Sequence, residues 1–104
     1  MKPYKFYHES LIKALKDPSE AAEYLNAALE EKDDKMFLVA LKNIAEAQGG
    51  MAELSRVTKL NRANLYKAFS RHGNPGIQTL WNVLHAFGLR LAVTTESKHD
   101  LRAV

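Results

Sequence analysis

The sequence predicts an all-α fold, a compact bundle of five to six short helices. Apolar residues recur at helical spacing in several segments, and Gly, Pro or Asp residues separate those segments. The chain has 104 residues, of which 46% are hydrophobic and 26% charged, an ordinary composition for a globular protein. Apolar and polar residues alternate once as in a strand, over residues 89–94, so the sequence also allows one short C-terminal strand.

The length predicts one domain over residues 1–104, because a chain of this size buries one small core but not two. Within it we expect a helical extension over about residues 1–34 and a core over about residues 35–95. A polar tail is expected over residues 96–104.

The first strong helix signal stands at Asp17-Pro18, where the aspartate caps a helix and the proline occupies its first position. Apolar residues then follow at 3.6-residue spacing and predict a helix over residues 18–31. Apolar residues between positions 11 and 15 indicate a short helical piece before it. The charged residues 31–35 predict a turn.

A second helix is expected from about residue 35 to residue 48, and the pair Gly49-Gly50 ends it with one glycine as a left-handed cap. Its inward stripe is formed by Phe37, Leu38, Leu41, Ile44, Ala45 and Gln48.

The last helix is expected over about residues 77–87, with Gly88 after its end. Its inward face is assigned to Leu80, Trp81, Leu84 and Phe87. This places Trp81 in the core rather than in a base-stacking position. The alternation that follows can form a strand only by finding an edge to pair with, and a second copy of the chain is the simplest partner.

Two shorter helices are expected between these, over about residues 51–58 and about residues 62–70, joined by a tight turn at Lys59 and Leu60. Asn61 is expected to cap the second by accepting a bond from a first-turn amide. Such a pair is typical of a helix-turn-helix. Residues of suitable size and polarity fill the six inward positions of the crossing: Leu54, Ser55, Thr58, Leu60, Leu65 and Ala68. Val57 is also expected to face inward on the first of the two helices.

Charge divides the chain into two opposite halves, although the net charge is only +3. Residues 17–34 hold seven acids against Lys32, whereas residues 51–90 hold six bases against Glu53. This split favours two surfaces with two partners, the alternative being two solvated faces.

Several function classes are excluded or disfavoured. The chain has no cysteine, which excludes disulfides and agrees with the cytoplasm. No apolar run reaches the roughly 18–20 residues of a membrane span, and the N-terminus lacks the apolar core of a signal peptide. There is no paired-carboxylate cleft, no Ser-His-Asp set and no phosphate-cradling glycine loop. Four scattered histidines do not make a metal site. We therefore expect no enzyme, no catalytic residue, no metal, no cofactor and no membrane contact.

The stretch LSRVTKLNRANLYKAFSRHGNPGIQTLWNVLHAFGLRLAV resembles the helix-turn-helix domain of the phage-repressor class, which has a lambda-repressor-like fold. DPSEAAEYLNAALEE and FLVALKNIAEAQGG precede it. In that order, over about residues 11–95, the chain is similar to the addiction-module antidotes, the HigA-like antitoxins of type II toxin–antitoxin modules. One departure is the turn residue Lys59, where the family usually has glycine. If this lysine keeps positive φ, it costs about 1 kcal/mol relative to glycine. The alternative is a turn of another geometry.

The resemblance implies a homodimer that binds double-stranded operator DNA, represses its own operon and neutralises a RelE/ParE-like toxin encoded nearby. The acidic N-terminal helix is the expected toxin side, by charge sign alone. The alternative is a phage-like transcriptional repressor without a toxin partner, and a neighbouring toxin gene distinguishes the two.

The second helix of such a motif lies in the major groove and its first residues meet base edges. The resemblance assigns base contact to Arg62, Ala63 and Lys67, and Asn64 can read an adenine from a more lateral position. Phosphate contact is expected along the rim, at Asn61, Tyr66, Ser70, Arg71 and Asn74 and at the backbone amides of Gly50 and Met51. The alternative for these side chains is a solvated face, and for Tyr66 a cover over the core edge.

Overall fold

The computed structural model describes residues 3–96, with side chains from Phe6 onward, and contains six helices in that range. They are α1 (Pro3–Ala14), α2 (Pro18–Glu30), α3 (Asp34–Ala47), α4 (Gly50–Thr58), α5 (Arg62–Ala68) and α6 (Ile77–Ala86). The predicted all-α bundle is thereby confirmed. The tail from residue 97 lies outside the described residues.

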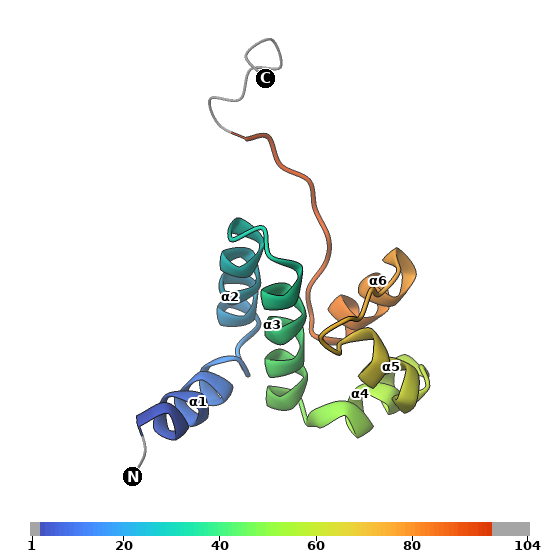
Figure 1. Cartoon of the computed structure of the whole chain (residues 1–104), viewed down its shortest axis with the longest axis horizontal. Coiled ribbons are helices and arrows are strands. Elements are labelled where there is room, and N and C mark those ends of the chain that lie inside the picture. Colours follow the sequence, from blue (N-terminus) through green and yellow to red (C-terminus); the bar gives the residue numbers. More distant parts are fainter. Residues whose placement is uncertain (1–2, 97–104) are drawn as a thin grey trace.

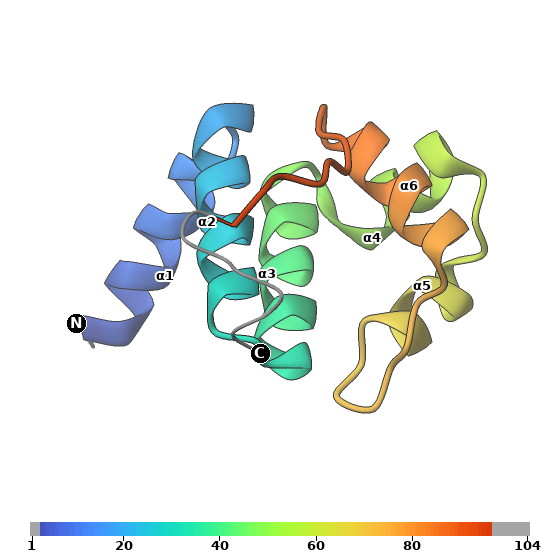
Figure 2. The same cartoon turned by 90° about the horizontal axis from the view of Figure 1, so that it is seen from above.

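The helices gather in two groups that meet at the α3–α4 junction. One group holds α1, α2 and α3, and the other holds α4, α5 and α6 (Figure 1). The view turned by 90° keeps the same separation (Figure 2). Helix α3 packs against α1, α2 and α4, while α4 packs against α5 and α6. The acidic and basic halves of the sequence therefore lie in different groups of helices.

Side-chain caps set where α2 and α3 begin. Asp17 accepts a 3.0 Å hydrogen bond from the Ser19 backbone amide, with Pro18 in the first turn, as the sequence predicted. Asp33 does the same for α3, accepting a 2.9 Å bond from the Lys35 amide. The charged break at residues 31–35 is thus also a helix start, because an aspartate oxygen satisfies an amide that the helix leaves free.

One apolar core runs through both groups of helices. It is centred on α3, where Leu41 and Ile44 are fully buried, and it reaches α6 through Val83 and Leu84. A polar contact lies beside it, where the Asn43 amide donates a 2.8 Å bond to the Tyr24 hydroxyl and ties α3 to α2. Across α1 and α3, the His8 ring nitrogen Nε2 lies 3.3 Å from the Glu46 carboxylate.

Two expected inward side chains are in fact exposed. Trp81 is 54% exposed, and the buried stripe of α6 uses Val83 in its place, with Leu84 and Phe87. Val57 on α4 is 49% exposed. Both corrections have the same cause. These short helices carry more apolar residues than one face can bury, so the sequence does not decide which of them face the core.

The expected strand after Gly88 is not formed within the described residues. The segment 89–96 leaves α6 without strand pairing (Figure 1). Leu91 and Val93 are 41% and 100% exposed. No edge within residues 3–96 offers the hydrogen bonds that a strand requires.

Candidate nucleic-acid interface

The turn between α4 and α5 is held by hydrogen bonds from small polar side chains. The Ser55 hydroxyl donates a 2.5 Å bond to the carbonyl oxygen of Leu60. The Thr58 hydroxyl donates a 2.7 Å bond to the Leu54 carbonyl and accepts a 3.2 Å bond from the Leu60 amide. Two of these bonds satisfy the amide and the carbonyl of Leu60, so side chains of α4 hold the turn in place locally.

Lys59 sits at the left-handed position of this turn, with φ 62° and ψ 20°. Its amide donates a 2.8 Å bond to the Ser55 carbonyl and closes the last turn of α4. The sequence marked this residue as the place where glycine is usual, and the turn does keep the glycine-like backbone.

Asn61 begins α5 as predicted. Its backbone is extended, and its side-chain oxygen accepts a 3.2 Å bond from the Asn64 amide. With that oxygen engaged, Asn61 presents its NH₂ group to solvent. The helix ends at Ala68 rather than at residue 70, because Phe69 caps it and turns inward to become 2% exposed.

Helix α5 has one inward and one outward face. Leu65 is 1% exposed and anchors it to the core. At about 100° per residue, Ala63 and Lys67 lie on the side opposite Leu65, one turn apart. The predicted base-contact residues Arg62, Ala63, Asn64 and Lys67 are all exposed. Ala63 and Lys67 therefore share the face opposite Leu65, whereas Arg62 and Asn64 are exposed to either side of it in the first turn.

The predicted phosphate contacts are distributed around that helix. Tyr66 is 52% exposed, which agrees with both of its predicted roles, a phosphate contact and a partial cover over the core edge. Arg71 and Asn74 are exposed in the loop after α5. The Ser70 hydroxyl already donates a 2.7 Å bond to the Lys67 carbonyl, which leaves its lone pairs but not its proton for another partner.

Gly50 and Met51 open α4, and no side chain caps that end. Their backbone amides therefore have no intrahelical acceptor, as expected for the first residues of a helix. The Met51 side chain is buried, so only its backbone can serve a phosphate.

The charge of this end is more one-sided than the sequence alone indicated. Glu53 is the one acid between residues 51 and 95, and both Nε and Nη2 of Arg56 donate to its Oε1, Nε at 2.9 Å. The bond from Arg56 lowers the pKa of Glu53 and raises the pKa of Arg56. Lys59, Arg62, Lys67 and Arg71 have no ion-pair partner among the described residues. Sequence reasoning missed this pair, although its spacing of three residues on a helix was a signal for it.

The described part of the chain shows no other kind of site at this end. Within residues 3–96, no His, Asp and Glu side chains are grouped to hold a metal ion. In the same range, no helix has the length and apolarity to cross a membrane.

Fold and site together define a small helical protein with one basic and one acidic region. In the basic region, helices α4 and α5 form a two-helix unit that exposes one face. The chain belongs to the family described as probable addiction module antidote proteins, whose model matches residues 6–95. It is 39% identical over 70 residues to an uncharacterised protein of Haemophilus influenzae, an alignment that covers 67% of this chain and 71% of that protein. No solved structure matches the chain. The family description names an antidote, and an antidote has a toxin as its partner.

Proposed function

We propose that the chain is a DNA-binding antitoxin. It binds double-stranded operator DNA through a helix-turn-helix made of α4 and α5, represses its own operon and neutralises a RelE/ParE-like toxin encoded nearby. The observation that carries the DNA-binding part is the acid-free outward face of α5, with Arg62 and Lys67 exposed and unpaired in the described structure. The membership of an antidote family supports the toxin-neutralising part.

The mechanism follows from the geometry of the two helices. With α5 in the major groove, the Arg62 guanidinium can donate two parallel bonds to guanine O6 and N7, and the Ala63 methyl can contact a thymine methyl. Lys67, one turn after Ala63, reaches a guanine or a phosphate. Arg71 and the amides of Gly50 and Met51 then set the register on the phosphate backbone.

A homodimer is part of this proposal, because one α5 reads only one half-site. Leu91 and Val93 offer alternate apolar side chains on an extended segment that has no pairing within residues 3–96. Pairing of this segment with its copy across a twofold axis would satisfy both its backbone and its side chains.

Co-expression of the chain with the product of its neighbouring gene tests the function. We expect the neighbour alone to stop growth, the chain to restore it, and the two to co-purify. In the same strain, a reporter driven by the DNA upstream of the pair should fall when the chain is present. Repression without rescue or a complex would leave the alternative, a phage-like repressor without a toxin. Rescue without repression would remove the DNA-binding role.

A further inference from the structure

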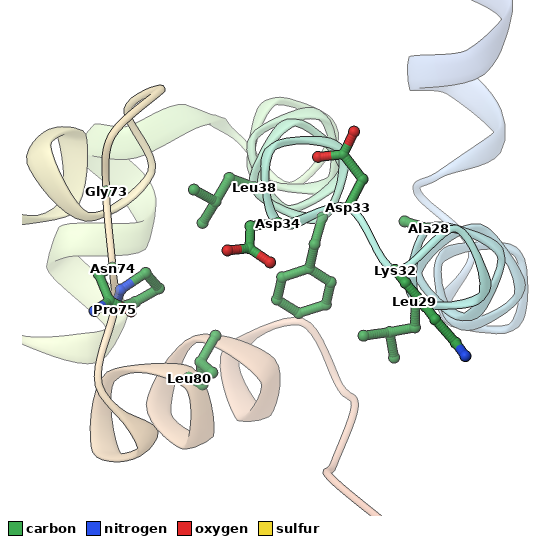
Figure 3. A pocket seen from close by; sticks show the side chains of 11 residues that line it. Ala28, Leu29, Lys32, Asp33, Asp34, Leu38, Gly73, Asn74, Pro75 and Leu80 are labelled. Carbon is green, nitrogen blue, oxygen red and sulfur yellow. The ribbon is translucent and has the colours of Figure 1, made fainter.

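A pocket of about 470 Å³ lies between the α2–α3 hairpin and the loop that joins α5 to α6 (Figure 3). Leu29 of α2 and Leu38 of α3 form one apolar wall, and Pro75 and Leu80 form the facing wall. The complete lining adds Ala28, Lys32, Asp33, Asp34, Phe37, Gly73 and Asn74. The pocket therefore touches both groups of helices.

The carboxylate of Asp34 faces this pocket. Figure 3 shows the Asp34 carboxylate directed into the space among the labelled side chains, whereas the Lys32 ammonium group points away from it. Asp33 is occupied in capping α3 through the Lys35 amide. The Asp34 side chain has no hydrogen bond or ion pair within the described residues. Asp34 is exposed in the first turn of α3, where the helix N-terminus favours its charge, so the carboxylate stays ionised and can accept charge-assisted hydrogen bonds from a cationic head group.

The shape of the walls indicates which cation fits. Lysine and arginine carry an apolar stem and a charged head, so the stem can pack against Leu29 and Leu80 while the head meets Asp34. The surroundings repel anions, since residues 17–34 hold seven acids against Lys32. This end therefore also attracts a basic protein over longer distances.

A second, more apolar groove lies on the outer side of α2 and α3 and has a volume of about 320 Å³. Met36 and Val39 line it. Its lining charges, Glu31 and Lys35, are of opposite sign, so it offers no net attraction to a cation. Charge therefore distinguishes the two surfaces and favours the pocket at Asp34.

We propose that the pocket at Asp34 receives a lysine or arginine side chain of the toxin, and that the acidic end around it is the toxin-docking surface. This inference rests on the proposed antitoxin function. It leaves the outward face of α5 free, because no residue of α5 lines the pocket. The pocket does share Asn74 with the predicted phosphate contacts, so a toxin seated there competes with DNA for that one side chain.

The test measures the affinity of the full chain for the purified product of the neighbouring gene. Asp34→Asn removes the anion, and Leu29→Gln changes the wall at a residue that is 53% exposed and so tolerant of a polar group. We expect each to raise the Kd about tenfold or more. Glu9→Gln is the matched charge control, since Glu9 is an exposed acid on α1 that lies outside both the pocket and residues 17–34. Val39→Gln is the matched apolar control, because Val39 is also 53% exposed. Both controls should stay within about twofold of the unmodified chain, and all four variants should melt near it.

The outcomes distinguish a failure of the proposed pocket from a failure of the proposed antitoxin function. If the unmodified chain binds no neighbouring product, the antitoxin function fails. If it binds, and both Asp34→Asn and Leu29→Gln bind equally well, the pocket is wrong while the function stands. A loss confined to Val39→Gln would move the docking surface to the outer groove. A change of oligomeric state in Asp34→Asn would make a second copy the occupant and would also overturn the proposal.

Discussion

The Ser55 hydroxyl donates to the Leu60 carbonyl oxygen at 2.5 Å, so a side chain of α4 holds the turn that leads into α5. The sequence placed Ser55 inward because it is small. The structure adds that its oxygen carries a hydrogen bond that an alanine of similar size cannot make.

Ser55→Ala should therefore lower the free energy of unfolding by about 1 kcal/mol, because the half-buried Leu60 carbonyl loses its donor. Urea denaturation followed by circular dichroism measures the change. Ser19→Ala is the control, since the Ser19 side chain is exposed and only its backbone amide is bonded. An unfolding midpoint for Ser55→Ala equal to that of Ser19→Ala would mean that the bond contributes nothing.

Lys59 holds a left-handed backbone with φ 62°, a conformation that costs a lysine about 1 kcal/mol or more. Lys59→Gly should raise the free energy of unfolding by up to about 1 kcal/mol, the gain being reduced by the greater freedom of glycine in the unfolded chain. Lys59→Val should lower it, because a β-branched residue tolerates positive φ poorly. The same denaturation series checks the order Gly, Lys, Val. Lys32→Gly, at φ 54°, should change in the same direction as Lys59→Gly. A valine variant as stable as the glycine variant would contradict the strain.

Particular residues show how far the sequence could predict this molecule. Asp17, Asn61 and the glycine pair after α3 carry local chemistry that decides a helix end without any tertiary partner. All three are confirmed, with Gly49 as the left-handed glycine at φ 109°. Trp81 could not be placed, because several apolar residues on and just after α6 compete for one buried face and only packing selects among them. For the candidate site, periodicity was enough to predict which side of α5 is exposed.

Asp34 and Glu53 show what the sequence could not predict about the proposed toxin-docking surface and the candidate nucleic-acid interface. The Asp34 carboxylate shares a pocket with Pro75 and Leu80, which are far from it in the sequence. No local sequence pattern therefore predicts this pocket. Whether a charged side chain is free or paired, as Glu53 is with Arg56, depends on rotamers that the sequence does not fix. Contacts to DNA and to a toxin are therefore proposals, which binding measurements on single-residue variants decide.

A substitution at Val93 tests whether the segment 89–96 after α6 pairs with its copy across a twofold axis. Val93→Asp should weaken the homodimer about tenfold or more, because a carboxylate at a paired apolar position is desolvated without a partner. Sedimentation equilibrium over a concentration series gives the dimer Kd. Val39→Asp, an equally radical change at an exposed valine of α3, is expected to leave the dimer intact. Dimerisation unaffected by Val93→Asp would exclude this segment from the interface.

Arg71 tests the phosphate contacts. It is exposed in the loop after α5 and has no ion-pair partner among the described residues. Arg71→Ala should weaken binding to all DNA sequences alike and reduce the slope of log K against log salt by about 1 for each protomer. Fluorescence anisotropy at several salt concentrations measures it. Lys16→Ala removes an equal charge at the acidic end and should leave the slope unchanged. A slope for Arg71→Ala equal to that of Lys16→Ala would place Arg71 away from the backbone.

The central claim is that the outward face of α5 reads base pairs, and a titration of Arg62→Ala tests it most directly. The DNA upstream of the gene pair is titrated with the unmodified chain, with Arg62→Ala and with Arg90→Ala, an exposed arginine outside α5. A parallel set of duplexes carries single base-pair changes. We expect Arg62→Ala to cost about 1–3 kcal/mol and to lose discrimination at one base pair of each half-site, whereas Arg90→Ala keeps the full pattern. Equal affinity and an unchanged base preference for Arg62→Ala would contradict base reading by α5.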